Sequence, residues 1–567
     1  MLRKLLVLLL LVTLAIAAGA YLLSPPRPPR PLPYNVLWLT AESLRPAHLS
    51  CYGYDKPTSP NIDAFAKRGT LFKWCINPSG WTNENMVSNL SGLYSPVHGV
   101  ISRDRHVPPE WYLPMEILRD AGLRTPRMQG FQGDLNHAYL GYDEEANNLD
   151  PSDWLEQHKD QQFFMWFHIL ESHLPYDAPE PHRGLFWRDE LVPNEAARKR
   201  VMAVHDNGVI LAGSIPFNRE EDLPGIRALY DADVHYMDSK FGRIMETLDR
   251  LGLREKTLVI FSADHGEELL ERGNVGHAST AKGGTLYDEI IHVPLIISMP
   301  GRLPEGLVID AQVRGVDVMP TVFDVLGLPA EKYFQGESLV PMMEDPAWRL
   351  DRVAYASSSF KGYQEDDPDH VVDFTRVVRT PEWKLYHQIR GGTDETYQLF
   401  HLADDAGETR DVGGEHPDKL AEMRRRLADW LAECKARRPR AEPYPSLWAA
   451  VRDQLGLRRA VDLSGVASPP LILSPTNGAL LSWETTRGEV EITWTGKPGI
   501  PYFLQAEIGQ GPYHFTLSIP VEGPRFRRSF EEGYWNEYVH RYNPIRFRVK
   551  VDAPGHEWSA WTQVRVE

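Results

Sequence analysis

Four short apolar runs constrain the fold of this chain more than any other feature. Runs of this length without polar alternation are typical of strands buried on both faces, as in parallel sheets covered by helices. Between the second and third runs, apolar residues from Tyr230 to Leu251 recur at alternating steps of four and three, which predicts one amphipathic helix that stops at Gly252. The pattern therefore predicts a large α/β domain. The four runs are NVLWLT at 35–40, FFMWFH at 163–168, TLVIFS at 257–262 and VPLIIS at 293–298.

The pattern changes near the C-terminus, where apolar residues alternate with polar ones, as in EVEITWTG at 489–496 and IRFRVKV at 545–551. About 100 residues of short alternating runs between Gly/Pro turns predict an all-β sandwich. WSAWT at 558–562 resembles the Trp-Ser-x-Trp-Ser stretch of some fibronectin type III domains, so we expect a fibronectin type III-like sandwich. The predicted units are an α/β domain at 34–435, a linker at 436–468 and the sandwich at 469–567.

The first 23 residues predict a segment outside the folded domains. MLRK is followed by an uncharged apolar run over 5–23, longer than the roughly 7–15 residues of a secretory signal and close to the roughly 20 of a spanning helix. We expect a transmembrane anchor, with a cleaved signal segment as the alternative. Arg3 and Lys4 should stay cytoplasmic, which would place the rest of the chain at the periplasmic or cell-surface side, or outside the cell after cleavage. A Pro-rich linker follows at 24–33.

The charge and the cysteine content exclude two classes of protein. A formal net charge of −17 over 567 residues argues against broad nucleic-acid binding, which needs a basic face. Anionic substrates stay open, because a bound metal ion can dominate the local field. Cys51, Cys75 and Cys434 make neither a disulfide scaffold nor a zinc-binding spacing.

Residues able to bind metal or phosphate follow the predicted strands. Glu42 comes after the first run, and Asp264 and His265 come after the third. His168 ends the second run, and His173 stands five residues later. Because ligands gather at the carboxyl ends of strands in an open α/β sheet, we expect these side chains to lie close together.

A divalent ion bound by Glu42, Asp264, His265 and one further oxygen is chemically reasonable. Mixed carboxylate and imidazole ligands suit Mn²⁺ or Zn²⁺ better than Ca²⁺, with Mg²⁺ as a further alternative. Thr82 is the candidate for the fourth ligand, since a metal would favour its alkoxide and the helix predicted after it would favour bound anions. The alternative for Thr82 is a plain helix cap, and Ser79 is the substitute nucleophile.

Four segments together resemble the sulfatase family of the alkaline phosphatase superfamily, over roughly residues 34–434. The resemblance implies an alkaline-phosphatase-like α/β sandwich with a large, mostly parallel central sheet. It also implies an enzyme that acts on ester bonds with one divalent metal ion. The segments are NVLWLTAESLRPAHLSCYGY at 35–54, DHGEE at 264–268, KGGTLYDEIIHVPLII at 282–297 and VDVMPTVFDVLGL at 316–328.

The chain departs from the family at the nucleophile. Sulfatases carry a Cys, sometimes a Ser, that becomes formylglycine in a Cys-x-Pro-x-Arg type motif. Alignment through LSGLYSPVHGV at 90–100 places Thr82 at that position, with Glu84 in place of the Pro and Met86 in place of the Arg. Without a Cys there, formylglycine cannot form.

The family's first two metal-binding Asp positions are Glu42 and Ser43 in this chain. A set of Glu, Thr, Asp and His resembles the phosphotransferase members, such as lipoteichoic acid synthases and phosphoethanolamine transferases. Those relatives keep substrate-binding or proton-donating histidines where this chain has His168, His173 and His277. Lys282 matches the sulfatase lysine before the Tyr-Glu segment, with one extra Gly between. The implied roles are catalytic for Thr82, His173 and His277, substrate-binding for His168 and Lys282, and metal-binding for Glu42, Thr82, Asp264 and His265.

We therefore expect an extracytoplasmic, metal-dependent enzyme that acts on phosphate esters through Thr82, by hydrolysis or by transfer. One alternative is a sulfatase, and another is an inactive domain that binds surface glycans through its β-sandwich. The expected partners are a phosphorylated or sulfated small molecule, glycan or lipid head group, and the membrane through residues 5–23. No nucleic-acid partner is expected.

Overall fold

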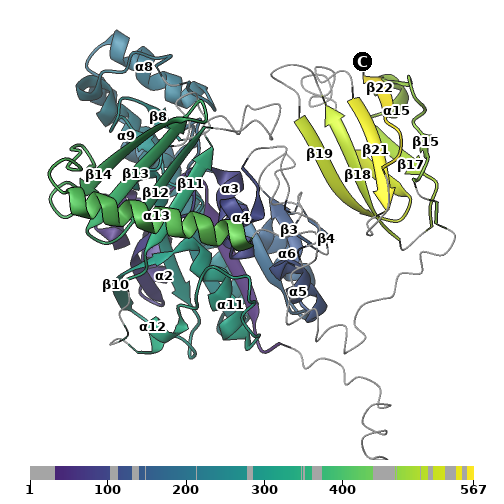
Figure 1. Ribbon diagram of the computed structural model, residues 1–567, viewed down its shortest axis with the longest axis horizontal. Coiled ribbons are helices and arrows are strands. Elements are labelled where there is room, and N and C mark those ends of the chain that lie inside the picture. Colours follow the sequence, from purple (N-terminus) through teal and green to yellow (C-terminus); the bar gives the residue numbers. More distant parts are fainter. Residues whose placement is uncertain are drawn as a thin grey trace, which may run out of the picture.

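The structure is a computed structural model, and it describes residues 32–566 with gaps. Along the chain an α/β body is followed by an all-β region (Figure 1). The gaps are 102–106, 108–110, 112, 130–139, 143, 147–148, 212, 278–284, 346–347, 349–350, 360–372, 438–465, 468, 498–499, 509–514, 530–544 and 552–557.

A mixed eight-stranded sheet forms the centre of the α/β body, in the order β10-β2-β9-β6-β1-β5-β3-β4. Strands β5, β1 and β6, which three of the apolar runs predict, lie side by side and parallel. Every residue of β1 and β6 is buried, which explains why their sequences do not alternate. The strands are β1 (Asn35–Ala41), β2 (Thr70–Ile76), β3 (Pro126–Gln129), β4 (Glu144–Glu145), β5 (Phe164–Ile169), β6 (Thr257–Ala263), β9 (His292–Ser298) and β10 (Leu307–Arg314).

The direction of β9 differs from the expectation of a mostly parallel sheet. This strand carries the fourth apolar run and pairs antiparallel with both β2 and β6. A strand at the centre of a sheet is buried on both faces whichever way it runs, so its apolar run does not encode its direction.

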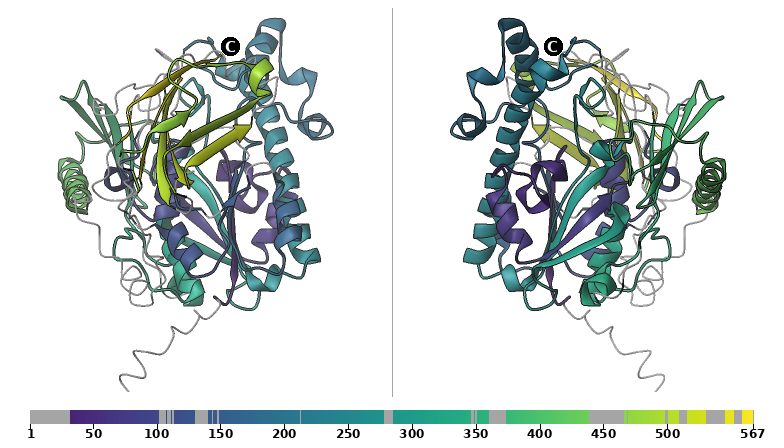
Figure 2. Two further views of the ribbon diagram at one scale, coloured as in Figure 1. Left: turned by 90° about the vertical axis from the view of Figure 1, so that its right-hand side faces the viewer. Right: turned by 90° about the vertical axis from the view of Figure 1, so that its left-hand side faces the viewer.

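Helices cover both faces of the sheet (Figure 2). On one face, α2 and α6 pack against the long helix α9, and on the other α3 packs against α4, α5 and α11. The predicted helix is confirmed as α9, which begins earlier than expected because the side chain of Asn218 caps it. The α-helices so far are α2 (Pro60–Ala66), α3 (Thr82–Ser91), α4 (Ser95–His98), α5 (Pro114–Asp120), α6 (Pro151–His158), α9 (Arg219–Arg250) and α11 (Val318–Leu326).

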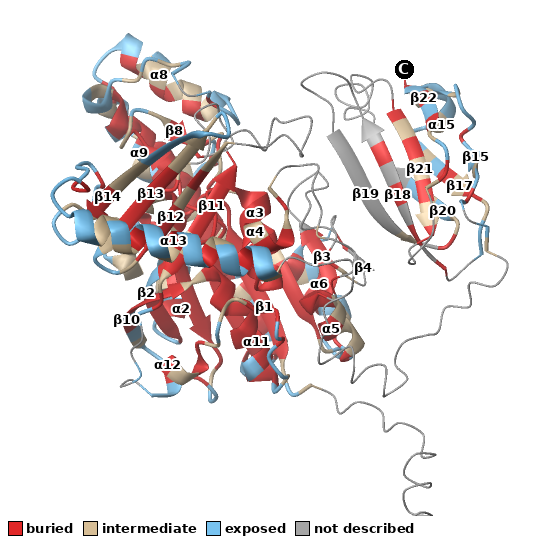
Figure 3. Cartoon of the chain, viewed as in Figure 1, coloured by how far each residue is buried: buried red, intermediate tan, exposed pale blue. Residues whose placement is uncertain are grey.

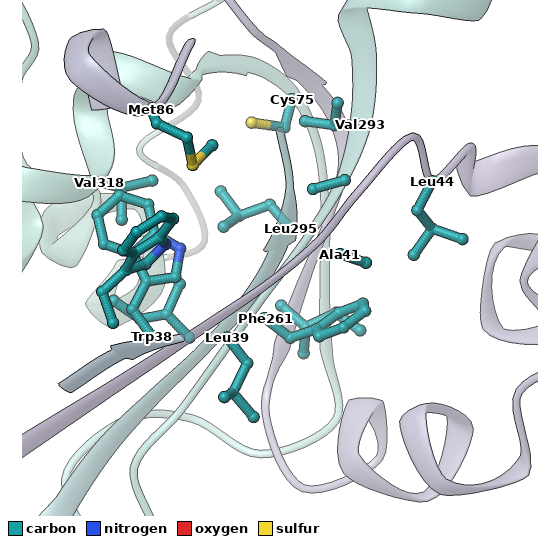
Figure 4. Close-up of a cluster of buried hydrophobic side chains, with 14 of the residues drawn as sticks. Trp38, Leu39, Ala41, Leu44, Cys75, Met86, Phe261, Val293, Leu295 and Val318 are labelled. Carbon is teal, nitrogen blue, oxygen red and sulfur yellow. The ribbon is translucent and has the colours of Figure 1, made fainter. Parts of the chain in front are cut away.

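The main core lies where the sheet meets these helices (Figure 4). Trp38 and Leu295 come from the sheet, Met86 from α3 and Val318 from α11, and all four are buried. The indole N–H of Trp38 donates to Ser262 Oγ at 2.9 Å, so this buried donor is not left without a hydrogen-bond acceptor.

A smaller antiparallel sheet, β11-β12-β13-β14, is packed by helix α13. Met423, Leu427 and Trp430 of α13 are buried, while the other side of the helix is exposed (Figure 3). These elements are β11 (Ala354–Ser359), β12 (Phe374–Arg379), β13 (Trp383–Arg390), β14 (Asp394–His401) and α13 (Pro417–Arg437). Shorter ones are α7 (His182–Phe186), α8 (Glu195–Asp206), α10 (Asp288–Ile291), α12 (Val340–Glu344), β7 (Glu268–Leu269), β8 (Val275–Gly276), and the 3-10 helices η1 (Pro46–His48), η2 (Ser50–Tyr52), η4 (Asp189–Leu191), η5 (Arg254–Lys256) and η6 (Gly315–Asp317).

The C-terminal region contains two sheets, β15-β17-β20 and β16-β22-β21-β18-β19, around its own apolar core. The predicted all-β character is confirmed, and the fibronectin type III-like topology stays a prediction. Most of the predicted linker at 436–468 lies outside the described residues. The elements are β15 (Ile472–Ser474), β16 (Leu480–Leu481), α15 (Trp483–Thr486), β17 (Glu489–Trp494), β18 (Pro501–Ile508), β19 (Phe515–Glu522), β20 (Arg525–Ser529), β21 (Ile545–Val551) and β22 (Thr562–Val566).

We correct the prediction of a membrane-anchored chain. In the part of the chain that the structure describes, no helix combines the length and the apolar character needed to cross a bilayer. Residues 5–23, on which the prediction was based, and most of the predicted Pro-rich linker lie outside that part.

Candidate active site

Three parallel strands end side by side and bring the predicted residues to one edge of the sheet. The register pairs Ala41 of β1 with Ile169 of β5 and with Ala263 of β6. The next residues, Glu42 and Asp264, therefore follow as neighbours, and both are fully buried. As the sequence predicts, the carboxyl ends of these strands collect side chains from distant parts of the chain.

The hydroxyl of Thr82 reaches this cluster from the first turn of α3. Its Oγ1 donates to Glu42 Oε1 at 2.8 Å and lies 3.2 Å from Nε2 of His265. The N-cap of the helix is Trp81, and no side chain caps that end. The interpretation of Thr82 as a plain helix cap is therefore wrong.

Asp264 offers one oxygen that nothing among the described residues satisfies. Its Oδ1 accepts the backbone N–H groups of Ser43 at 2.9 Å and His265 at 2.7 Å. Its Oδ2 is buried, has no hydrogen-bond partner and lies 3.1 Å from His265 Nε2. The Nδ1–H of that imidazole donates to the carbonyl of Gly266 at 2.8 Å, which leaves Nε2 with a lone pair. A bare carboxylate oxygen beside an imidazole lone pair fits a cation between them.

The whole donor set fits a divalent metal ion. Ligand atoms of Glu42, His168 and Asp264 lie within 4.8 Å of one another, and so do those of Glu42, His265 and His277. All five residues are buried. Buried carboxylate and imidazole donors suit a transition metal such as Mn²⁺ or Zn²⁺.

His168 lies behind Glu42. Its Nε2 is 2.6 Å from Glu42 Oε2, and its Nδ1 is 2.8 Å from Thr40 Oγ1, which also accepts the indole N–H of Trp166 at 3.1 Å. The substrate-binding role predicted for His168 stays a prediction, but these contacts suit a residue that orients Glu42. The ends of β1 and β5 thus supply a buried hydrogen-bonded chain that the sequence pattern does not reveal.

His265, His277 and His173 form a row of imidazoles. The ring centroids are 4.1 Å apart for the first pair and 5.2 Å apart for the second. His277 Nδ1 lies 3.1 Å from Oε1 of Glu267, a carboxyl whose pKa burial raises to about 8. His173 is half-buried, so the row runs from the enclosed cluster toward its more open end.

Burial and mutual contact set the charges of the cluster. Burial opposes ionisation of Glu42, but the charge and hydrogen bond of His168 outweigh it and hold the pKa of Glu42 well below its ordinary value. Burial, followed by the charge of Glu42, raises the pKa of Asp264. Burial also lowers the pKa of His265, and lowers that of His277 to about 4. Both imidazoles are therefore neutral at pH 7, as metal ligands and proton acceptors must be.

One predicted residue is engaged away from the cluster, and another cannot be placed. Ser79 is buried, and its hydroxyl donates to Glu84 Oε2, so this substitute nucleophile is engaged elsewhere. Burial raises the pKa of Glu84 to about 8. Lys282 lies outside the described residues.

Asn77 is a site residue that the sequence analysis missed. Its Nδ2 donates to the backbone carbonyls of Ala263 at 2.9 Å and Asp264 at 2.5 Å. It immediately follows β2, just as Glu42 and Asp264 follow their strands. Its position directly after a strand could have identified it, but no uninterrupted apolar run predicts β2, so the end of that strand was not recognised.

Two family models match the chain. The model described as Sulfatase matches residues 34–328, just over half of the chain. A second model, described as N-sulphoglucosamine sulphohydrolase, C-terminal, matches residues 282–437.

Curated relatives include arylsulfatase K from Rattus norvegicus, 27% identical over 285 residues that make up 47% of this chain and 48% of the relative. Arylsulfatase K from Homo sapiens is 30% identical and covers 44% of this chain and 48% of its own length. An ulvan-active sulfatase from Formosa agariphila is 22% identical over 74% of this chain and 78% of its own. The chain thus spans about half the length of the arylsulfatase K relatives it matches.

Solved structures share the fold. One protein, in complex with its substrate D-glucosamine-2-N,6-O-disulfate, has a TM-score of 0.56 and 19% identity, and covers 71% of this chain and 98% of its own. The phosphonate monoester hydrolase of Agrobacterium radiobacter has a TM-score of 0.54 and 21% identity, and covers 71% of this chain and 95% of its own.

Proposed function

Because the chain belongs to the sulfatase family, we propose that it is a metal-dependent hydrolase of esters of a tetrahedral oxyanion, with sulfate esters of sugars or small molecules as the first candidate substrates. The relatives named as arylsulfatases and an ulvan-active sulfatase support this substrate class. They also favour hydrolysis over transfer to an acceptor.

One observation carries the proposal: the Thr82 hydroxyl already donates its proton to Glu42 Oε1 at 2.8 Å. Thr82 Oγ1 attacks the sulfur or phosphorus, the bond from that atom to the leaving ester oxygen breaks, and the hydroxyl proton moves toward Glu42 along the existing hydrogen bond. His168 holds the second oxygen of Glu42 at 2.6 Å and fixes the carboxylate in this orientation. Water then releases the esterified threonine.

The proposed ligands of the metal are Glu42, Thr82, Asp264 and His265, with Mn²⁺ or Zn²⁺ preferred over Mg²⁺ or Ca²⁺. A bound divalent ion supplies positive charge that favours the threonine alkoxide and withdraws electrons from the group under attack. The unsatisfied Asp264 Oδ2 supports this assignment.

The row of imidazoles suits the oxyanion and the leaving group. We assign His277 to the non-bridging oxygens and His173, the half-buried member, to the leaving oxygen, where a proton is needed. Lys282, as a point charge for an anionic oxygen, stays a prediction.

A second candidate is a phosphate or phosphonate monoesterase. Thr82 stands where sulfatases carry the formylglycine precursor, and a plain hydroxyl with Glu, Asp and His resembles the phosphotransferase members of the superfamily. The structural similarity to a phosphonate monoester hydrolase is compatible with this candidate.

A direct test compares 4-nitrophenyl sulfate, 4-nitrophenyl phosphate and 4-nitrophenyl phenylphosphonate as substrates of the purified protein loaded with Mn²⁺ or Zn²⁺. We expect turnover of at least one ester and its loss, by a factor of about 10³ or more, in Thr82→Ala. The highest kcat/KM identifies the ester class. Full turnover in Thr82→Ala would sink the proposed nucleophile, and inertness toward all three esters would favour the glycan-binding alternative.

A further inference from the structure

Five side chains of the C-terminal region form an alternating stack of cations and indoles, which we call the Trp–Arg ladder. Its order is Arg546, Trp561, Arg548, Trp558 and Lys550. Successive cation-to-centroid distances are 5.1, 4.5, 4.7 and 5.0 Å, within the range of cation–π attraction. All five side chains are half-buried. Nothing in the proposed ester chemistry uses them.

The ladder follows from the alternation of β21. Ile545, Phe547, Val549 and Val551 point into the core and are buried, so the three cations between them lie on the opposite side of the strand. Ser559, between the two tryptophans, bonds Val549 twice: its N–H donates to the Val549 carbonyl at 2.8 Å, and its Oγ accepts the Val549 N–H at 2.9 Å. The WSAWT segment is thus fixed along β21.

The charge of this strip stands out from the rest of the chain. Residues 469–567 hold ten Lys and Arg against eleven Asp and Glu, whereas the whole chain has a net charge of −17. Strand β21 itself carries three cations and no acid. Arg546 pairs with Gln563 of β22, so Arg565, two residues on, adds a cation on the same side. The register with β18 puts one acidic position, Glu507, beside Arg546 at one end of the ladder.

We propose that the Trp–Arg ladder binds a polysulfated glycan. Alternate residues of a strand are roughly 7 Å apart, so the ladder presents a periodic row of cations to a chain with periodic anionic groups. Guanidinium groups bind planar pairs of sulfate oxygens through their N–H edges. The indoles offer apolar surface to sugar rings. The choice of sulfate as the anion rests on the proposed function of the α/β body.

The experiment measures binding of the full-length protein to dextran sulfate, with unsubstituted dextran of the same length as the control ligand. The ladder variant is Arg546→Gln/Arg548→Gln. The matched control is Arg525→Gln/Arg527→Gln, which removes the same charge from β20, where these arginines pair with Glu491 and Glu489. We expect the ladder variant to bind dextran sulfate at least tenfold more weakly. The control should stay within twofold of the unmodified chain.

Turnover of the small 4-nitrophenyl ester should be equal in all these variants, because the ester site lies in the α/β body. Failure of the glycan proposal is therefore distinguishable from failure of the proposed function. If the double variant does not fold, Lys550→Gln at the end of the ladder is the second variant, with an expected loss of about threefold.

Three results would overturn the inference. These are equal losses in the ladder variant and its charge-matched control, equal affinity for dextran and dextran sulfate, and tighter binding of a single-stranded oligonucleotide than of dextran sulfate. The last matters because aromatic and basic strips also bind single-stranded nucleic acid.

Discussion

Thr82 and Glu42 are joined by a hydrogen bond of 2.8 Å although 40 positions separate them in the sequence. The bond links the first turn of α3 to the end of β1, and it carries the nucleophile assignment. Five further predictions follow from the contacts around it and from the fold that holds it.

Glu42→Gln should lower kcat/KM by a factor of about 10²–10⁴, because it removes the proton acceptor of Thr82 and one proposed metal ligand. Glu84→Gln is the matched control: it makes the same exchange at a buried carboxyl two residues from Thr82, where burial raises the pKa to about 8 and the group is mostly uncharged at pH 7. Steady-state kinetics with the best ester measures both. Equal losses in the two variants would contradict the assigned role of Glu42.

His168→Ala should weaken Mn²⁺ binding by about 10–100-fold, because it removes the bond that orients Glu42. His168→Gln, whose amide can replace the Nε2–H donor, should recover part of the loss. Calorimetric titration with Mn²⁺ alone gives this result without reference to turnover. If alanine leaves the affinity unchanged, His168 does not position the ligand.

Metal removal should lower the stability of the α/β body. At a free Mn²⁺ concentration 100 times the Kd, binding stabilises the folded state by about 2.7 kcal/mol, and a chelator should abolish this gain. Asp264→Asn should show a much smaller difference between metal and chelator, since it replaces the unsatisfied Oδ2. Thermal unfolding of both proteins with Mn²⁺ and with a chelator measures the stability that the metal adds to each. An equal thermal shift in both proteins would place the ion elsewhere.

The buried ion pairs of Asp288 predict that the stability of the fold depends on pH. Burial opposes its ionisation, but ion pairs with Arg379 at 2.7 Å and Lys384 at 2.9 Å outweigh that and hold its pKa far below the ordinary 3.8. A depressed pKa stabilises the fold above pH 3.8 and loses that contribution as pH falls, by up to about 1.4 kcal/mol per pH unit.

Asp288→Asn should therefore cost about 3–5 kcal/mol at pH 7 and progressively less below pH 3.8. Urea unfolding of both proteins at pH 7 and pH 3 gives the two differences. If Asp288→Asn lowers the free energy of unfolding equally at pH 7 and pH 3, the depressed pKa of Asp288 is contradicted.

Met86 shows why one substitution should not restore the sulfatase motif. The sequence resemblance places it where the motif has Arg, but its side chain is fully buried in the core (Figure 4). Met86→Arg should destabilise the fold by at least about 3 kcal/mol, because it buries a charge in an apolar cluster. Met86→Leu should cost less than about 1.5 kcal/mol. Unfolding midpoints compare the two, and a Met86→Arg variant as stable as Met86→Leu would disprove the argument.

The sequence predicts the sheet, the long helix and the strand-end residues because these depend on local burial and on the geometry of parallel strands. Glu42, His168 and Asp264 meet since each ends or follows a strand of one sheet. Contacts between side chains on different elements are not encoded in spacing. The bond of His168 to Glu42 and the amide contacts of Asn77 with the end of β6 therefore became visible only in three dimensions.

The same limit explains the incorrect details. The apolar run of β9 is equally compatible with either direction, and the sequence could not choose. Threonine is favoured at helix N-caps, but α3 begins at Thr82 itself, so Trp81 occupies the N-cap position. The membrane prediction came from the composition of 5–23, and no described helix supports it.

The position of β6 between β1 and β9 has a consequence for biosynthesis. A growing chain that has emerged as far as β5 already carries Glu42, Thr82 and His168, but not Asp264 or His265. The proposed set of metal ligands therefore stays incomplete until translation passes residue 265 and β6 pairs with β1. On the proposed ligand set, a chain that ends before Asp264 lacks two of the four donors, so binding of the cation belongs to a late stage of folding.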